Sequence, residues 1–353
     1  MTTQILSTDE ALPFQTAVSE AVRLLNAGQV VALPTETVYG LAADALNPEA
    51  VARIFEAKER PSFDPLIVHL PHRKDLETVA EVPEDIEPVL KKIAEAFWPG
   101  PLTIVLPKKA CVPDIVTAGL PTVAVRVSKD PVFTRVVRTF NKPLAAPSAN
   151  RFGSLSPTSA SAVKAELDGR IPLILDGGAS NHGLESTIIK IEPNSPKPLI
   201  TILRPGPITQ DDLKPFGIIK LGYKPDKKIR HGAAAPEPAI EAPGMLASHY
   251  APRTPLRLME NPEDFIPEPG KKYALLSYRG EADDGYTELT EWVGMHILSP
   301  GKGKLIEAGV RLFYALRELD KLGVDEIIAE PVAEHGLGAA IMDRLRRASV
   351  KRQ

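Results

Sequence analysis

The sequence predicts an α/β protein built on a mixed, twisted β-sheet with packed helices, followed by a smaller Rossmann-like α/β unit. Short apolar runs typical of buried strands, at 30–33, 66–70 and 102–106, are interspersed with amphipathic segments typical of helices, at 13–27 and 132–140. The order of strands and helices does not follow the strict β–α–β alternation of a doubly wound parallel sheet. We therefore expect parallel and antiparallel strands within one sheet.

The composition is that of an ordinary globular protein. Of the 353 residues, 43% are apolar and 25% are charged, which are usual values for a soluble protein. The net charge of −3 argues against a general nucleic-acid coat, because such proteins are normally basic. The single cysteine, Cys111, excludes an intramolecular disulfide and a cysteine-rich metal site. No apolar run approaches the roughly 18 residues of a membrane span, and the first residues do not resemble a signal peptide. We expect a cytoplasmic location and no membrane partner.

The chain divides into three predicted parts: a first domain at 1–219, a linker at 220–252 and a C-terminal domain at 253–353. Lys, Pro, Ala and Gly dominate the linker and hydrophobic periodicity disappears there. The C-terminal part is predicted to contain, in order, a strand at 273–277, a helix at 305–322, a strand at 326–329 and a helix at 339–348. That pattern is typical of a Rossmann-like unit, but GxGxxG is missing, so a dinucleotide site is not expected there.

A hydroxyl-rich turn, Thr35-Glu36-Thr37, follows the strand at 30–33, where Pro34 ends the run because it cannot donate to a sheet ladder. The carboxyl edge of an open α/β sheet is where ligands bind. The sequence therefore predicts a ligand site beside this turn.

A short helix and two cations come next. Asn47-Pro48 is typical of a helix start, and the helix should end near Lys58 because Arg60 precedes a proline. In an extended segment, Lys58 and Arg60 would point the same way. A hydroxyl loop facing two cations suits a polyanionic ligand.

Further polar residues are placed at strand ends, and the common catalytic motifs are missing. No P-loop, HExxH, CxxC or GxSxG pattern occurs, so neither a zinc protease nor a serine hydrolase is indicated. The polar groups are Thr122 with Arg126 on one strand, Ser148 with Asn150, Ser186-Thr187 and Arg204. Each also has a simpler interpretation: the cations after the helix as dipole partners, Ser148 and Asn150 as turn formers, and His69 as a core histidine.

Taken together and in order, these segments resemble the threonylcarbamoyl-AMP synthase family. The motifs are PTETVYGL, Lys58-Glu59-Arg60, PLIVH, WPGPLT, TVAVR, PSAN, STI and LRPGP, and APGMLASHYAP at 242–252 is similar to the linker signature of the long, two-domain form. Two stretches depart from the family pattern. Arg-Phe-Gly-Ser follows Asn150 where a hydroxyl residue directly before glycine is expected, and 246–248 lacks basic or aromatic residues.

The resemblance implies a nucleotidyltransferase that converts ATP, L-threonine and bicarbonate into L-threonylcarbamoyladenylate, pyrophosphate and water. It implies Mg²⁺ entering with ATP, no metal held by protein ligands, and a product consumed by a tRNA threonylcarbamoyl-transfer complex. The residues it assigns to threonine are Thr37, His69, Arg126 and Ser186. Those it assigns to ATP are Lys58, Arg60, Asp64, Thr122, Ser148, Asn150, Ser156, Arg204, His249 and Tyr250. Lys58 and Arg60 would be the catalytic cations, and the linker would carry an active-site lid motif.

Two alternatives from other classes stay open on the sequence. The implied fold is related to double-stranded RNA-binding modules, for which the acidic charge balance is unfavourable. A carbamoyl-transfer enzyme of hydrogenase maturation shares the domain, but with zinc and acylphosphatase modules that this sequence lacks.

Overall fold

The computed structural model describes residues 2–223, 242–243 and 250–350, and its main element is a large sheet. The strands of this sheet are β1 (Gln4–Ser7), β2 (Val31–Leu33), β3 (Gly40–Asp44), β4 (Ile67–His69), β5 (Leu102–Pro107), β6 (Thr122–Arg126), β7 (Leu144–Ala145), β8 (Leu173–Asp176), β9 (Thr187–Glu192), β10 (Leu199–Arg204) and β11 (Ile218–Leu221). Their order is β1-β8-β2-β3-β7-β4-β6-β5-β9-β10-β11. Strand β6 pairs parallel with β4 and antiparallel with β5, so the predicted mixed sheet is confirmed.

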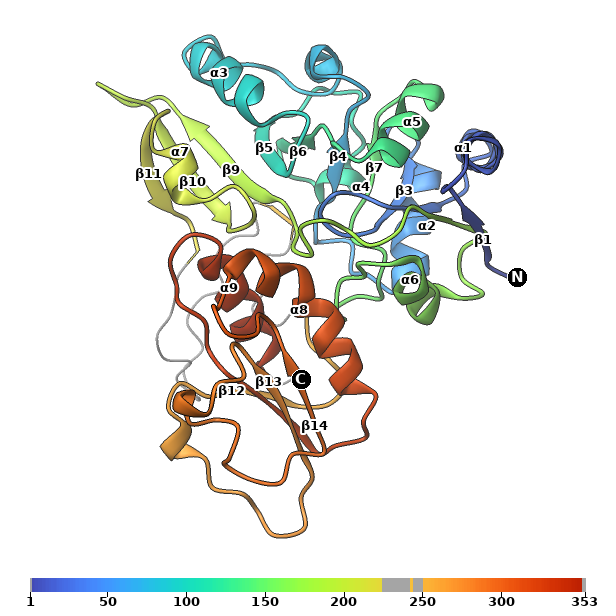
Figure 1. Cartoon of the computed structure of the whole chain (residues 1–353). Coiled ribbons are helices and arrows are strands. Elements are labelled where there is room, and N and C mark those ends of the chain that lie inside the picture. The colour runs from blue at the N-terminus through green and yellow to red at the C-terminus, as the bar shows by residue number, and fades with distance from the viewer. Residues whose placement is uncertain (1, 224–241, 244–249, 351–353) are drawn as a thin grey trace.

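Helices cover both faces of the sheet around β2, β3 and β8 (Figure 1). The helices of this part are α1 (Ala11–Asn26), α2 (Pro48–Lys58), α3 (Glu87–Phe97), α4 (Asp114–Thr117), α5 (Pro131–Phe140), α6 (Ala160–Leu167) and α7 (Gln210–Leu213). Successive strand residues point to opposite faces. Val31 and Leu33 accordingly pack with α1 and α5, whereas Ala32 packs in the core that contains α2.

The short helix α2 begins and ends where the sequence predicts, at Pro48 and Lys58, but the chain that follows it is not extended. The Asn47 side chain accepts hydrogen bonds from the backbone N–H groups of Glu49 and Ala50, which caps the helix. Glu59 then adopts a left-handed conformation with φ 53°, and the Arg60 N–H bonds back to the Phe55 carbonyl. The expectation of an extended Lys58–Arg60 segment is therefore wrong, because the helix closes with a left-handed cap between the two cations.

Several strands were missing from the sequence prediction. The β3 segment, Gly-Leu-Ala-Ala-Asp, is buried on both faces and shows no apolar–polar alternation. Strands β1 and β11 lie at the two edges of the large sheet. Short edge strands carry a weak periodic signal, since few of their side chains need to be apolar.

The C-terminal part forms a parallel four-stranded sheet with helices. Its elements are β12 (Leu256–Leu258), β13 (Tyr273–Ser277), β14 (Gly294–Ile297), α8 (Leu305–Asp320), β15 (Glu326–Ala329) and α9 (Gly338–Ala348), with strand order β12-β15-β13-β14. Both helices pack in one core on the same face of this sheet. The opposite face is covered by Phe265 and Tyr286 from the long connections. The predicted Rossmann-like unit is confirmed, with β12 and β14 as strands that the sequence did not indicate.

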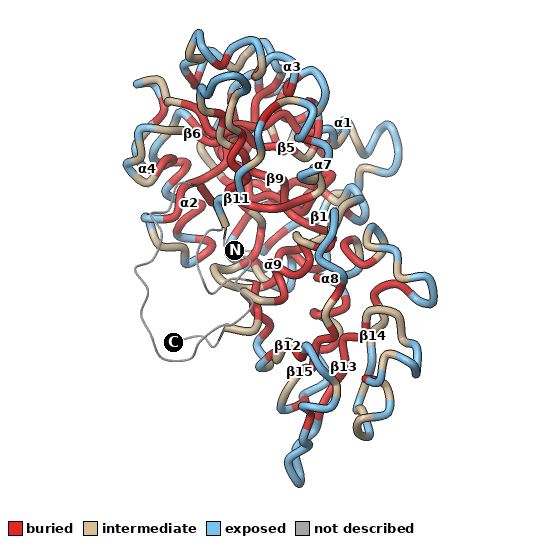
Figure 2. Tube along the Cα trace, turned by 90° about the vertical axis from the view of Figure 1, so that its left-hand side faces the viewer, coloured by how far each residue is buried: buried red, intermediate tan, exposed pale blue. Residues whose placement is uncertain are grey.

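The two parts are in close contact. Val38, Leu155 and Leu184 share the apolar core of α8 and α9. A Cβ added to Gly183 would lie 2.6 Å from the Gly309 carbonyl oxygen of α8, so the backbones meet where no side chain fits. In Figure 2 the buried segments of the two parts meet at α8 and α9.

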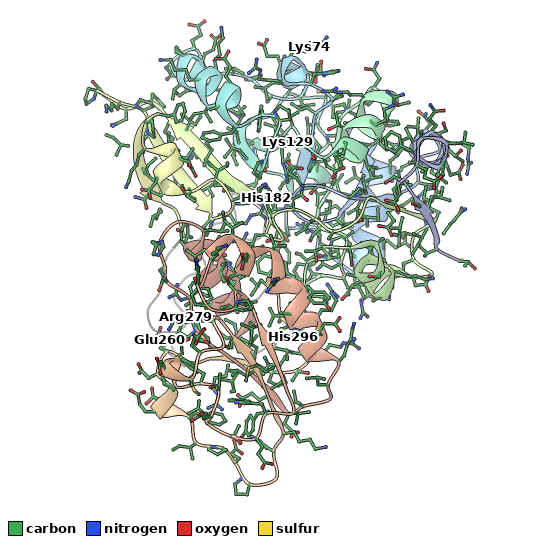
Figure 3. The ribbon with its side chains drawn as sticks, viewed as in Figure 1. Lys74, Lys129, His182, Glu260, Arg279 and His296 are labelled. Atoms are coloured by element: carbon green, nitrogen blue, oxygen red, sulfur yellow. The ribbon has the colours of Figure 1, made fainter. Side chains whose placement is uncertain are left out.

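His182 marks this junction. Its side chain is labelled between the two parts in Figure 3, and its backbone N–H donates to the Glu36 carbonyl at 2.9 Å. The turn that carries Glu36 is thereby tied to the loop that packs on α8. Of the helices that the structure describes, none is both long and apolar enough to cross a membrane.

Candidate functional site

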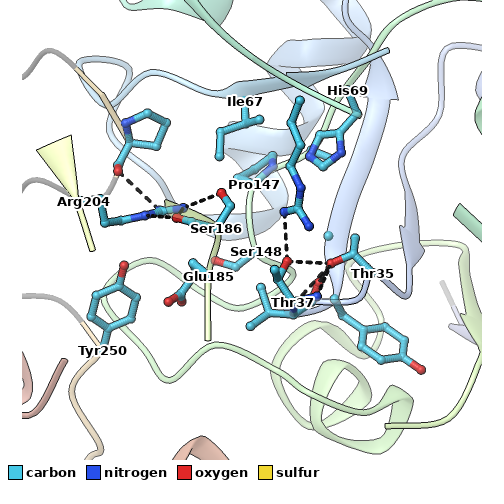
Figure 4. A pocket seen from close by; sticks show the side chains of 16 residues that line it. Thr35, Thr37, Ile67, His69, Pro147, Ser148, Glu185, Ser186, Arg204 and Tyr250 are labelled. Atoms are coloured by element: carbon cyan, nitrogen blue, oxygen red, sulfur yellow. Dashed lines mark hydrogen bonds between the residues drawn. The ribbon is translucent and has the colours of Figure 1, made fainter. Parts of the chain in front are cut away.

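A small cavity of about 50 Å³ brings together seven of the predicted site residues. Figure 4 shows it between the turn after β2 on one side and Arg204 with Tyr250 on the other. Of the predicted residues, those that line it are Thr37, His69, Arg126, Ser148, Ser186, Arg204 and Tyr250.

The cavity lies against one face of the large sheet as well as at the ends of its strands. Ile67 and His69 are two residues apart on β4, so they share a face, and both line the cavity. Val68 points the other way, into the core that contains α2 and α3. On the cavity face, Ile67, Ala124 and Ile188 pack with Ala242 of the linker segment. Ala242 therefore covers part of the sheet face from which the cavity opens.

The turn after β2 is organised by the Thr35 hydroxyl. Thr35 Oγ1 accepts from the backbone N–H groups of Thr37 and Val38 and donates to the Val38 carbonyl at 2.6 Å. Since its proton is used there, Thr35 accepts from Thr37 Oγ1 at 2.8 Å. The Thr37 hydroxyl in turn accepts from Arg126 Nη1 at 2.9 Å. This chain of hydrogen bonds orients Thr37 toward the cavity.

Arg126 is held by a carboxylate that the sequence analysis did not assign. Its Nη2 lies 2.7 Å from Glu36 Oε1, and its Nε donates to the Gly100 carbonyl. Burial by itself raises the pKa of the Glu36 carboxyl, but Arg126, the Ser128 hydroxyl and the Lys129 N–H lower that pKa to about 2. Glu36 is thus ionised and paired at neutral pH. In the sequence, the only indication that Glu36 belongs to the site was its position between the two threonines of the turn.

His69 is a neutral, buried imidazole beside Arg126. Burial and the Arg126 charge lower the pKa of His69 to about 3. Its ring packs against Phe133, with 4.7 Å between the ring centroids. Its Nδ1 is buried and has no hydrogen-bond partner among the described residues. Because His69 lines the cavity, it gives this wall a neutral polar side chain.

A second hydrogen-bond network forms the opposite wall. Arg204 donates to the Ser186 carbonyl through Nε and Nη2, and its Nη2 also donates to Ser186 Oγ at 3.1 Å. Ser186 Oγ is in addition 2.8 Å from the Thr103 hydroxyl. Arg204 Nη1 reaches the carbonyl of Pro243 in the linker. Two guanidinium groups thus face one cavity from opposite sides.

Lys58 and Arg60 do not line the cavity. The Lys58 ammonium donates to the carbonyls of Ser148 and Asn150, so it supports the loop that lines the cavity. Burial, followed by repulsion from Arg60, lowers the pKa of Lys58 well below its ordinary value. Arg60 Nη2 is 2.9 Å from Asp64 Oδ2 and also donates to the Pro65 carbonyl.

The other predicted residues are spread around the cavity. Thr122 begins β6, at the opposite end of that strand from Arg126. Asn150 uses its side-chain amide to bond the carbonyls of Arg151 and Ser154, as a turn former does. Ser156 donates to Glu185, a buried carboxylate in the cavity wall that the sequence analysis also missed. His249 lies outside the described residues.

Tyr250 extends the site toward the C-terminal part. It is buried, lines the cavity and has a left-handed backbone with φ 62°, a conformation that is uncommon for residues other than glycine. Its ring lies 5.7 Å from that of Phe313 on α8. The C-terminal part therefore holds the end of the linker against the cavity.

Comparison with known proteins agrees with this architecture. A family model described as telomere recombination matches residues 23–206, and one described as the C-terminal domain of threonylcarbamoyl-AMP synthase matches 208–350. The threonylcarbamoyl-AMP synthase of Pyrococcus abyssi is 40% identical over 342 residues, covering 93% of each chain. That of Bacillus subtilis is 39% identical over 353 residues, covering 97% of this chain and 95% of the relative.

Solved structures show the same relationship. The crystal structure of P. abyssi Sua5 complexed with L-threonine has a TM-score of 0.80 and 38% identity and covers 98% of both chains. These matches favour neither an RNA-binding module nor a hydrogenase-maturation enzyme. This chain therefore belongs to the threonylcarbamoyl-AMP synthase family, whose enzymes catalyse the first step of threonylcarbamoyladenosine formation in tRNA.

Proposed function

We propose that the cavity between Arg126 and Arg204 is where L-threonine, bicarbonate and ATP react to give L-threonylcarbamoyladenylate, pyrophosphate and water. The observation that carries this assignment is the pair of buried guanidinium groups on opposite walls, with threonine and serine hydroxyls between them. One guanidinium suits a carboxylate and the other suits phosphate oxygens.

The chemistry needs no nucleophile from the protein. The amine of threonine and bicarbonate give a carbamate and water. A carbamate oxygen then attacks the α-phosphate, a new P–O bond forms, and the bond to the β-phosphate breaks with release of pyrophosphate. Catalysis comes from positioning the two substrates and from cations that oppose the phosphate charge.

Thr37, His69, Arg126 and Ser186 form the proposed threonine side. Arg126 is held rigidly by Glu36, and its Nη1 faces the Thr37 hydroxyl. A substrate carboxylate can accept from this nitrogen, and the neutral side chain of His69 lines the same cavity. Because both groups are already oriented, little side-chain freedom is lost when threonine binds.

The proposed ATP side combines residues in the cavity wall with supports behind it. Ser148, Arg204 and Tyr250 line the cavity. Ser156 and Asn150 hold the neighbouring loop, and Lys58, Arg60 and Asp64 lie behind it. We also assign Lys58 and Arg60 to the triphosphate, on which they act from behind the cavity wall because neither lines the cavity, and we assign Thr122 and His249 to the same substrate.

Mg²⁺ fits this site as a companion of ATP. Nowhere in residues 2–223, 242–243 and 250–350 do three or more His, Cys, Asp or Glu side chains form a group that could hold a metal ion. Mg²⁺ commonly keeps water and substrate phosphates as ligands. The ion accordingly arrives with the nucleotide, and the guanidinium groups complete the charge balance.

The linker at 220–252 acts as a lid between a catalytic domain at 1–219 and a C-terminal domain at 253–353. Support comes from Ala242 on the cavity face of the sheet, from the Pro243 carbonyl on Arg204, and from buried Tyr250. A lid protects a mixed anhydride from water. The product is then taken up in the cytoplasm by a tRNA threonylcarbamoyl-transfer complex.

The test is a reaction with purified protein, Mg²⁺, ATP, bicarbonate and L-threonine. We expect pyrophosphate and an AMP-linked threonylcarbamoyl product, both of which depend on threonine. Omitting threonine or chelating the metal is the matched control. Release of ADP and phosphate, or indifference to threonine, would contradict the proposal.

A further inference from the structure

Arg344, in the C-terminal helix α9, is a fully buried arginine that reaches out of its own domain. Its Nε donates to Glu185 Oε2 at 3.1 Å, and its Nη1 donates to the Pro205 carbonyl at 2.6 Å. Both partners belong to the part of the chain that forms the cavity wall. One side chain thus joins the C-terminal helix to two loops of the large sheet.

The two residues that Arg344 bonds outside its own helix are the chain neighbours of Ser186 and Arg204. Ser186 and Arg204 bond to each other directly, through Arg204 Nη2 and Ser186 Oγ at 3.1 Å. Arg344 therefore holds this pair from behind, one residue before Ser186 and one residue after Arg204. The second oxygen of Glu185 accepts from Ser156, so the same ion pair also determines where that hydroxyl lies.

Arg344 also contacts the end of the linker. Its guanidinium carbon lies 5.4 Å from the centroid of the Tyr250 ring, which is within the range of a cation–π interaction. The aromatic ring of Tyr250 is in contact with Phe313 as well. Tyr250 is therefore held between two helices of the C-terminal part.

Stability alone does not account for this arrangement. A buried ion pair gains little over well-packed apolar side chains, because both charges lose their hydration. Burial disfavours the charge of Arg344, yet the Tyr250 oxygen, Glu185 and Asp343 hold its pKa above the ordinary value. Its Nη2 has no hydrogen-bond partner in the described part of the chain. Fixing the positions of other polar groups is one use of such a buried charge.

We infer that Arg344 is a positioning residue for the synthase reaction, through which the C-terminal domain holds Glu185, the Arg204 loop and Tyr250 in the geometry that binds ATP. The inference rests on the proposed assignment of Ser156, Arg204 and Tyr250 to the ATP side. It gives the C-terminal domain a direct part in the site although Arg344 does not line the cavity.

The test compares full-length Arg344→Met, Glu185→Gln and the double variant with the wild type. Kinetics of threonine-dependent pyrophosphate release give kcat and the KM for each substrate, calorimetry gives ATP affinity, and thermal melting reports folding. We expect Arg344→Met to raise the KM and Kd for ATP about tenfold or more, with the KM for threonine changed by less than about threefold. The double variant should bind ATP about as tightly as whichever single variant binds it less tightly, because both substitutions act through one ion pair.

Arg346→Met is the matched control. Arg346 lies on the same helix and pairs with Glu334, away from the cavity, so its loss should leave both KM values near those of the wild type. Arg344→Lys retains the charge and should recover part of the ATP affinity, since a lysine can pair with Glu185 but cannot also reach Pro205 in the same way.

Unchanged ATP affinity in Arg344→Met would overturn the inference. So would equal increases in the KM for ATP and the KM for threonine that parallel a fall in the melting temperature. If Arg344→Met does not fold, Glu185→Gln decides alone, and normal ATP affinity in that variant overturns the inference. Failure of the wild type to make pyrophosphate would overturn the proposed reaction instead. ATP calorimetry separates the two results because it does not require turnover.

Discussion

Arg126 and Glu36 form a buried ion pair, with 2.7 Å between Nη2 and Oε1. The pair links the end of β6 to the turn after β2, and both side chains are at most 5% exposed. Arg126 therefore does two things: it compensates a buried carboxylate, and it presents its Nη1 to the cavity beside Thr37. A variant of Arg126 must be examined for both.

Arg126→Ala should weaken threonine binding more than ATP binding, because the substrate carboxylate loses its partner. We expect a loss of about 2–5 kcal/mol of binding free energy, measured by calorimetry. The same change should lower the free energy of unfolding by about 3–5 kcal/mol, since Glu36 is left buried and unpaired. The double variant Glu36→Gln with Arg126→Ala should recover much of the stability without recovering threonine binding. Normal threonine affinity in the double variant would refute the assignment.

Arg60→Ala should weaken ATP binding and leave threonine binding nearly unchanged. The expected loss is about 1.5–3 kcal/mol, the usual size for a hydrogen bond to a charged group. Asp64→Asn is the control, because it weakens the ion pair between Asp64 Oδ2 and Arg60 Nη2, which lie 2.9 Å apart, but keeps Arg60 itself. If calorimetry showed Arg60→Ala and Arg126→Ala losing the same ligand, the division of the site into two sides would be wrong.

His69 should make the protein less stable as the pH falls below about 6.5. The folded protein keeps this imidazole neutral until about pH 3, whereas the unfolded chain binds a proton near 6.5. Stability is therefore lost with falling pH, at about 1.4 kcal/mol per pH unit for one group. Urea denaturation of the wild type and His69→Asn between pH 7 and 5 measures this difference.

The Glu36 carboxyl serves as the control for that experiment. Its pKa is lowered from 4.5 to about 2, so its contribution is present above 4.5 and is lost only as the pH falls below that value. The Glu36 carboxyl itself therefore adds nothing to the slope between pH 7 and 5. Its charge helps to raise the pKa of Asp130 to about 6, so Glu36→Gln should change that slope only through Asp130. Equal slopes for the wild type and His69→Asn would show that His69 is not held neutral.

Tyr250→Ala, and separately a chain that ends after Leu221, should lose synthesis while retaining part of the nucleotide binding. Tyr250 lines the cavity and is packed between Phe313 and Arg344, so its removal opens one wall. We expect at least a tenfold fall in product formation, about 1.4 kcal/mol in the barrier, together with more ATP hydrolysis. Tyr250→Phe retains the ring and is the control. Full synthesis by the truncated chain would show that the linker is only a tether.

Much of the fold could be predicted because its signals are local. Asn47 begins α2 by accepting hydrogen bonds from the next few residues, and Pro48 is the first residue of the helix. Val31, Ala32 and Leu33 form an apolar run because their strand lies between two cores, toward which successive side chains point in turn. The left-handed cap at Glu59 was missed because its sequence, Lys-Glu-Arg, contains none of the glycine or asparagine that usually marks such a position.

The sequence by itself determined which residue types reach the cavity: the hydroxyls of the turn after β2 and the polar residues at the ends of β4, β6 and β10. Only the tertiary structure decided how those residues are paired. Arg126 meets Thr37 across 89 residues, and Arg344 meets Glu185 across 159 residues. Caps, turns and periodicity depend on neighbours within a few residues, so a sequence displays them. These two long-range contacts depend on the order of strands in the sheet and on the packing of α9 against it, which no local pattern records.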